Sequence, residues 1–214
     1  MKIQKIKNRS VLFTTSPSSE WDLNIHLIMG EKNNYIIDTG LGPQGVKPVL
    51  DYIKGNEKPI IIINTHYHWD HIWGNNLFEN ETIISHKFCF EMIRDNWDEM
   101  INENKKYMQG EVSMHLPNLV FEKEMYFEED NIRIIYTPGH SIDSISVLDE
   151  KDKILNAGDN IGDTMDQIVP HIYCGKSLYM DTLNKYSQMN FDTCISGHNI
   201  VLGKDIIEKI KNCI

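Results

Sequence analysis

The chain has 214 residues, a length that suits one domain able to bury a sizeable core without disulfides. Its formal net charge is −10, and the densest Lys and Arg stretches, at 2–9 and 204–211, are short. A protein that follows a nucleic-acid backbone normally has a basic stripe, so nucleic acid is not expected as a partner.

The first residues are basic but lack the apolar stretch and cleavage site of a secretory signal peptide. No apolar run approaches the length of a membrane span, so we expect no membrane association. The cysteines form no CxxC pair and no dense framework; they are Cys89, Cys174, Cys194 and Cys213. Together these features favour a cytoplasmic protein with reduced thiols.

Apolar patterning predicts the elements of the first half of the chain. Residues 24–29 and 35–38 are β-prone runs separated by a turn-like Gly-Glu-Lys-Asn-Asn segment, which predicts a hairpin. Residues 44–54 have apolar side chains at helical spacing, and the β-branched run at 59–64 is typical of a buried strand. A short strand at 81–85 and a long helix at about 87–108 are expected next.

The second half alternates between strands and helices. Strands are expected at about 125–127, 132–136, 144–148, 153–156 and 193–196, and helices at 177–189 and 204–213. Two groups of strands with helices between and outside them indicate layered α/β packing. No repeat, low-complexity segment or Pro/Gly/Ser-rich linker divides residues 1–214, so we expect a single domain.

The segment directly after the predicted strand at 59–64 reads Thr-His-Tyr-His-Trp-Asp-His. In an extended backbone, residues two apart project to the same side, so His66 and His68 can converge on one ion. A helix that starts near Asp70 and His71 turns those two side chains toward a second point. In this composition such a string arises by chance on the order of once in a thousand. Imidazole and carboxylate ligands suit zinc, with manganese and iron(II) also allowed.

Three further candidate ligands stand at the ends of predicted strands. His140 ends a Thr-Pro-Gly-His segment, Asp159 ends Ala-Gly-Asp, and His198 ends Ser-Gly-His. Each is preceded by glycine, which permits a tight turn and a close approach of backbone. Any one of these signals is weak alone, but together with 66–71 they offer enough ligands for two ions.

In order and separation these motifs resemble the metallo-β-lactamase superfamily, most closely its glyoxalase II-like and lactonase-like hydrolases. The resemblance runs from the strand at 24–29 and the Ile37-Asp-Thr-Gly turn to the Ser-Gly-His segment. It implies a four-layer αββα sandwich with the site at one edge, between the sheets. In that fold, residues 1–214 form one hydrolase domain with a helical insertion at about 87–117.

The resemblance also implies a ligand set for two metal ions. The first ion is held by His66, His68 and His140, the second by Asp70, His71 and His198, and Asp159 bridges them. Asp38 is implied to order the ligand loop rather than to bind metal. Trp73 stands where many relatives have a glycine, and we expect it to pack in the core.

This ligand set implies a hydrolase with two divalent ions, zinc being favoured over iron or manganese. A metal-bridging hydroxide would attack a small ester, lactone or thioester, and Asp70 is the catalytic candidate that passes its proton to the leaving group. Substrate contacts are expected from the loop at 14–22, the insertion at 87–117 and the loop at 162–175, and the candidate residues are Trp21, His171 and Tyr173. We expect a small-molecule substrate, and the sequence leaves a homodimer open.

Three alternatives remain open. One is a mononuclear iron enzyme similar to the persulfide dioxygenases, which use only the equivalents of His66, His140 and Asp159. A second is a small phosphodiesterase, and a third is a binding protein without activity. Asp159 in the bridging position argues against a true β-lactamase, and His68 argues against the di-iron oxygen and nitric oxide reductases. Residues 1–214 leave no room for the C-terminal helical extension that binds glutathione in glyoxalase II, so a glutathione thioester is not expected as the substrate.

Several other polar residues have plainer interpretations. His26 and His86 are expected to be structural, and His115 is expected in a surface loop. The charged segment at 103–106 is interpreted as a solvated helix face.

Overall fold

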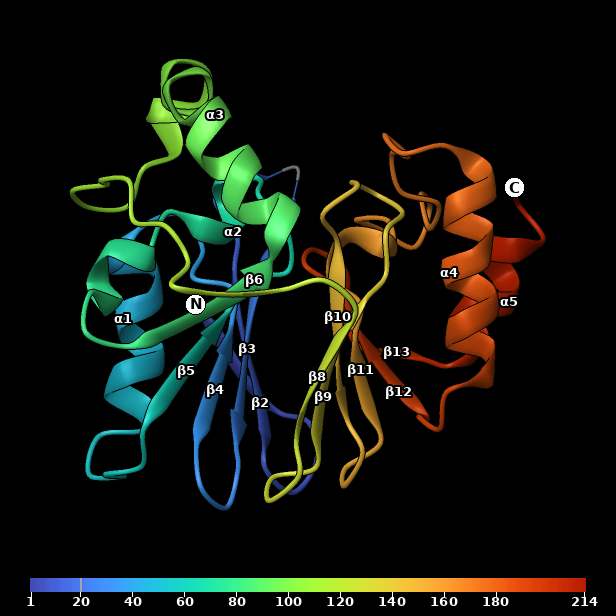
Figure 1. The fold of residues 1–214 in the computed structure, drawn as a ribbon, viewed down its shortest axis with the longest axis horizontal. Helices are drawn as coiled ribbons and strands as arrows, with labels where there is room; N and C mark the ends of the chain where they lie inside the picture. Colours follow the sequence, from blue (N-terminus) through green and yellow to red (C-terminus); the bar gives the residue numbers. More distant parts are fainter. Residues whose placement is uncertain (20) are drawn as a thin grey trace.

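The structure, a computed structural model, describes residues 1–19 and 21–214 and contains two β-sheets packed face to face (Figure 1). The first sheet has seven strands, in the spatial order β1 (Lys2–Lys5), β2 (Ser10–Thr15), β3 (Leu23–Met29), β4 (Asn34–Ile37), β5 (Ile60–Ile63), β6 (Thr82–His86) and β7 (Leu119–Phe121). Neighbours are antiparallel from β1 to β4 and parallel from β4 to β7.

The second sheet has six strands. Their spatial order is β13 (Leu202–Gly203), β12 (Thr193–Ile195), β11 (Ile154–Asn156), β10 (Ile145–Asp149), β9 (Ile132–Tyr136) and β8 (Glu124–Phe127). All neighbouring pairs are antiparallel except β11 with β12, which run parallel.

Helices cover the outer faces of both sheets. The α-helices are α1 (Pro43–Tyr52), α2 (Trp69–Ile72), α3 (Lys87–Asn104), α4 (Lys176–Gln188) and α5 (Asp205–Lys211). Short 3₁₀ turns occur at η1 (Asn75–Phe78), η2 (Lys105–Tyr107) and η3 (Gly158–Asn160). In the described part of the chain, no helix combines the length and the hydrophobicity needed to cross a bilayer.

Three hydrophobic clusters hold the layers together. Val46 and Val49 of α1 pack against the first sheet, and Leu183 and Tyr186 of α4 pack against the second, with α5 beside α4. A third cluster joins isoleucines and aromatic rings from the facing sides of the two sheets. The order of layers is therefore helix, sheet, sheet, helix, and the predicted αββα sandwich is confirmed (Figure 1).

The side chains of β5 explain why that strand lies in the interior of its sheet, between β4 and β6. It consists of four consecutive isoleucines, and the last three are buried, Ile62 against α1 and Ile63 against the second sheet. A β-branched strand covered on both faces is typical of a parallel sheet. Its carboxyl end is thereby fixed at the edge of the sandwich, where the loop at 64–68 begins.

A buried carboxylate ties the first sheet to the second. Asp130, in the turn between β8 and β9, accepts hydrogen bonds from the backbone of Lys32 and Asn33 and from the Tyr35 hydroxyl at 2.7 Å. Burial raises the pKa of Asp130, but these hydrogen bonds outweigh it and leave the pKa below its usual value. The turn of the β3–β4 hairpin is thus held by a charged group from the opposite sheet.

The structure differs from the sequence-based expectations mainly at sheet edges. The edge strands β1, β7 and β13 are not predicted, because they are short and mostly exposed. The interior strand β2, with buried Val11, Leu12 and Phe13, is also absent from the predicted strands. Trp73 is fully buried and its ring lies 5.0 Å from that of Trp69, so the expected packing role is confirmed. All four cysteines are free.

Candidate metal centre

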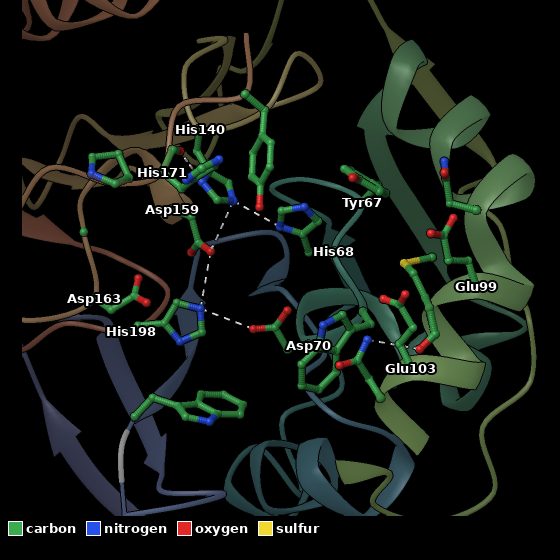
Figure 2. Close-up of a pocket in the computed structure, with 18 of the residues that line it drawn as sticks. Tyr67, His68, Asp70, Glu99, Glu103, His140, Asp159, Asp163, His171 and His198 are labelled. Carbon is green, nitrogen blue, oxygen red and sulfur yellow. Dashed lines mark hydrogen bonds and ion pairs between the residues drawn. The ribbon is translucent and has the colours of Figure 1, made fainter. Parts of the chain in front are cut away.

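The candidate ligands all follow the carboxyl ends of strands, at one edge of the sandwich. His66 and His68 follow β5, His140 follows β9, Asp159 follows β11, and His198 follows β12. Because parallel strands end at the same edge of a sheet, the pairs β4–β5 and β11–β12 bring these loops together. Figure 2 shows the ligands from both sheets pointing toward one another.

The first group of side chains consists of His66, His68, His140 and Asp159. His68 Nδ1 lies 2.9 Å from His66 Nε2 and 3.0 Å from His140 Nε2. The Asp159 carboxylate oxygen Oδ2 lies 3.6 Å from His66 Nε2 and 3.8 Å from His140 Nε2. Three ring nitrogens and a carboxylate oxygen thus converge on one point.

The second group consists of Asp70, His71 and His198. The helix α2 begins just after His68 and turns Asp70 and His71 away from the first group. Asp70 Oδ2 lies 3.5 Å from His71 Nε2 and 3.2 Å from His198 Nε2. The ligand atoms of each group lie within 4.8 Å of one another, so each can surround one ion.

Asp159 stands between the two groups. Besides its contacts in the first group, its Oδ2 lies 3.3 Å from both His71 Nε2 and His198 Nε2. One carboxylate oxygen therefore faces four imidazoles, two from each group. This position is the one that a bridging ligand between two cations requires.

In three of the candidate histidines, a hydrogen-bond partner at Nδ1 determines that Nε2 faces the other ligands. His71 Nδ1 is paired with Asp38 Oδ2 at 2.8 Å, His140 Nδ1 with the His171 carbonyl oxygen at 2.9 Å, and His198 Nδ1 with the Asp22 carbonyl oxygen at 2.7 Å. Such partners set the tautomer and the ring orientation of metal-binding histidines. In all three residues Nε2 is left to face the cluster.

Close backbone approaches at two glycines bring the ligands within reach of one another. A Cβ at Gly197 would lie 2.2 Å from Asp159 Oδ1 and 2.7 Å from His71 Cε1. Gly158 has a φ of +53°, and a Cβ there would lie 3.0 Å from Thr65 Cβ. The Gly-Asp and Gly-His steps in the sequence therefore have a physical reason: a side chain at either glycine would push the ligand loops apart.

The cluster favours a bound cation. Burial lowers the pKa of His66 well below its usual value, with nearby imidazoles adding to the effect. Burial also acts to lower the pKa of His71 and His198, but the carboxylates of Asp159 and Asp70 outweigh it and raise both values well above normal. Positive charge is thus stabilised at this end of the cluster, whether a proton or a metal ion carries it.

The donor set fits divalent metal ions. Among the described residues, His71 Nε2 and Asp159 Oδ1 are buried without a hydrogen-bond partner, an arrangement that is costly unless another group binds them. Imidazole nitrogens with carboxylate oxygens match the ligands of zinc and of related first-row ions.

A cavity of about 690 Å³ opens above the cluster and contains the predicted substrate contacts. Trp21, His171 and Tyr173 all line it, together with His68, Asp70 and other ligands. Figure 2 shows His171 on the same side of the cavity as His140 and Asp159. The Trp21 ring lies 5.5 Å from that of His198, and the Tyr173 ring 5.4 Å from that of His140. Of the loop at 14–22, Glu20 lies outside the described residues.

The sequence places substrate contacts in the insertion at 87–117 and the loop at 162–175, but it does not single out every side chain of this cavity wall. Glu99 and Glu103 of α3 line it, and so does Asp163 on the loop after η3. Glu103 is exposed, as expected for the solvated face at 103–106, and it also lines the cavity. Helical spacing places Asn96, Glu99 and Glu103 along one side of α3, but the sequence does not indicate that this side faces the cavity.

The remaining histidines lie where the sequence places them. His26 is buried, and burial lowers its pKa to about 3. His86 caps α3, its Nδ1 accepting a hydrogen bond from the Phe88 amide at 3.2 Å. His115 is half-buried in an irregular segment and does not line the cavity.

Comparisons with known proteins agree with this geometry. A sequence model described as the metallo-β-lactamase superfamily matches residues 20–198. A probable metallo-hydrolase of Methanocaldococcus jannaschii is 28% identical over 147 residues, covering 68% of this chain and 59% of the relative. A protein of Homo sapiens named acyl-coenzyme A thioesterase is 25% identical over 166 residues, covering 65% of this chain and 58% of the relative. The chain thus spans less than two thirds of the length of these relatives.

Solved structures show the same fold at lower identity. A metallo-β-lactamase from Hirschia baltica superimposes with a TM-score of 0.76 at 16% identity, covering 99% of this chain and 96% of the other. One from Pontibacter korlensis gives a TM-score of 0.74 at 14% identity, covering 98% and 97%. At such identities the likeness concerns the arrangement of the backbone.

Proposed function

The chain belongs to the metallo-β-lactamase superfamily, and on that premise we propose that it is a dinuclear metal-dependent hydrolase of small esters, lactones or thioesters. Zinc is the favoured metal, because the donors are imidazole and carboxylate. Relatives named metallo-hydrolase and acyl-coenzyme A thioesterase support a hydrolytic reaction, and the second name supports thioesters among the substrates.

The position of Asp159 Oδ2 carries the proposal. It lies 3.3 to 3.8 Å from the Nε2 atoms of four histidines, two in each ligand group. A mononuclear site needs only His66, His140 and Asp159. It would not explain why Asp70, His71 and His198 also converge on one point. Their convergence favours a second ion over the iron dioxygenase alternative.

When bound, a pair of divalent ions supplies an activated water of lowered pKa and polarises the carbonyl group of the substrate. The residues of the chain then have separable tasks. Asp159 and the histidines hold the cluster, while Asp38 and the carbonyls of Asp22 and His171 keep three rings in place.

Asp70 both contacts a candidate ligand and faces the cavity. Its Oδ2 is 3.2 Å from His198 Nε2, and its side chain reaches the wall of the cavity where substrate must enter. A carboxylate there can accept a proton from the attacking water and return it to the leaving oxygen or sulfur. We therefore assign the proton transfer to Asp70.

A substrate panel tests this proposal. The zinc-loaded protein is assayed with a thioester, an aryl ester, a lactone and a phosphodiester, each before and after removal of metal by a chelator. We expect metal-dependent cleavage of at least one carbonyl substrate and loss of about 10²-fold or more in rate for Asp70→Asn. Metal-dependent cleavage of the phosphodiester alone, or cleavage that survives complete metal removal, contradicts it.

A further inference from the structure

The cavity above the ligand cluster has an acidic wall. Glu99, Glu103 and Asp163 line it in addition to Asp70 and Asp159, and none of the described residues that line it is a lysine or an arginine (Figure 2). Asp70 and Asp159 belong to the ligand cluster, whereas Glu99, Glu103 and Asp163 lie on the wall outside it. This outer part of the wall is therefore acidic and favours positively charged over negatively charged ligands.

Glu99 and Glu103 place two negative charges side by side on this wall. They stand four residues apart on α3, a spacing at which like charges disfavour a helix. Within the described residues neither takes part in an ion pair. Lys106, just beyond the helix, lies over the Tyr107 ring at 4.8 Å and does not line the cavity. A cation bound between these carboxylates would offset their repulsion.

Aromatic rings form another part of the wall. Trp21, Tyr67, Trp69 and Tyr173 line the same cavity. The rings of Trp21 and Trp69 lie 6.0 Å apart at 87°, and the second of them stacks on Tyr107 at 5.3 Å. Aromatic faces attract ammonium groups, and neighbouring carboxylates add to that attraction. Carboxylates with aromatic rings are thus a combination suited to a cationic ligand.

The cavity is also where the ligand cluster meets solvent. Asp159 is only 7% exposed, yet it lines the cavity, and its Oδ1 has no hydrogen-bond partner among the described residues. His68, His140 and His198 reach the same wall. The acidic and aromatic side chains therefore surround the place where a substrate has to approach the cluster.

We propose that the substrate is an ester or thioester carrying an ammonium group, held by Glu99, Glu103 and the aromatic wall while its carbonyl group faces the ligand cluster. This inference rests on the proposed hydrolase function. It disfavours anionic acyl carriers such as coenzyme A or glutathione, because their negative groups would face the same carboxylates.

Binding of a simple cation tests the charge preference without any chemistry. The zinc-loaded protein is titrated by calorimetry with choline, with its uncharged isostere 3,3-dimethylbutanol and with an anionic carboxylate of similar size. We expect choline to bind about tenfold more tightly than the isostere, with the difference reduced at about 0.5 M salt. Equal binding of choline and the isostere, or tighter binding of the anion, overturns the proposal.

Two charge-matched variants locate the effect. Glu99→Gln/Glu103→Gln removes two charges from the cavity wall, and Glu91→Gln/Asp98→Asn removes two from α3 outside it. We expect the first variant to weaken choline binding about tenfold, the upper range for two partly exposed charge contacts, and the second to leave it within about twofold. Equal losses of choline affinity in both variants would mean that the net charge of the protein explains the binding. That result would overturn the assignment to this wall.

Hydrolysis separates this inference from the function on which it rests. Acetylthiocholine is compared with its uncharged carbon isostere and with S-acetyl-3-mercaptopropionate. Faster cleavage of the anionic or neutral thioester leaves the hydrolase function standing and overturns the cationic substrate. Selective choline binding with no cleavage of any ester or thioester overturns the hydrolase function instead, and leaves a cavity that binds cations.

Discussion

Asp38 holds His71 from behind: its Oδ2 lies 2.8 Å from His71 Nδ1, and both side chains are buried. The same carboxylate accepts hydrogen bonds from the amide and the hydroxyl of Thr65, the residue just before His66. One side chain thus orders both ends of the loop that contains four of the candidate ligands. Its own backbone has a φ of +62°, which the turn after β4 imposes.

This arrangement predicts that Asp38→Asn weakens metal binding while keeping the turn. Asparagine tolerates positive φ, so the backbone is conserved, but the charge behind His71 is lost. Loss of such an outer partner lowers metal affinity by about 10- to 100-fold. Competition with a chromophoric chelator measures the change. Asp51→Asn, on the exposed side of α1, is the control, and unchanged affinity in Asp38→Asn would contradict the assigned role.

Gly197→Ala should damage the cluster without a change in charge. The added methyl group would lie 2.2 Å from Asp159 Oδ1, so the bridging carboxylate or the loop must move. A displacement of about 1 Å at a reacting centre can cost on the order of 10²-fold in rate. We expect that loss in hydrolysis and a lower zinc content. Gly203→Ala, where the nearest atom belongs to the exposed Asp205 side chain, should retain both.

Asp130 predicts a specific dependence of stability on pH. Its folded-state pKa lies below the unfolded value, so its stabilisation is complete above the unfolded value of about 3.9 and is lost as pH falls through the folded pKa. Asp130→Asn should therefore lower the free energy of unfolding by about 2–3 kcal/mol at neutral pH, the worth of hydrogen bonds to a charged group. Urea unfolding of both proteins should show the difference shrinking below about pH 4. A constant difference across pH would refute a charged Asp130.

Metal removal should change stability as well as activity. A ligand present at about 100 times its dissociation constant stabilises the folded state by about 2.7 kcal/mol. For a domain of this size that corresponds to a rise of roughly 5–10 °C in Tm. We expect the chelated protein to melt that much lower and to recover when zinc is restored. The same Tm with and without metal would count against a cluster that binds metal in the folded chain.

The sequence was sufficient for the parts of the fold where local pattern and tertiary position agree. The four isoleucines of β5 predict a buried strand, and the strand at 132–136 coincides with β9. The seven candidate ligands were found because their spacing reflects strand ends and glycine turns. Strands β1 and β7 were missed because three of the four residues of β1 and two of the three of β7 are exposed, so they show no apolar alternation.

What the sequence could not reveal depends on how distant segments meet. The His171 carbonyl, which positions His140, is a backbone group and leaves no trace in residue type. Glu99 and Glu103 belong to a helix with few buried residues, so only the packing of α3 beside the cavity shows which polar side faces the cluster. The acidic wall is therefore a property of the tertiary structure.

Metal stoichiometry tests the central claim most directly. Elemental analysis of zinc-loaded, desalted protein should give about two ions per chain. Asp159→Ala should retain about one, because each group is left with three ligands and the three imidazoles of the first group form the better zinc site of the two. The control Asp166→Ala, on the exposed loop before α4, should retain two. One ion per chain in the unaltered protein, or two in Asp159→Ala, would contradict a pair of cations joined by this carboxylate.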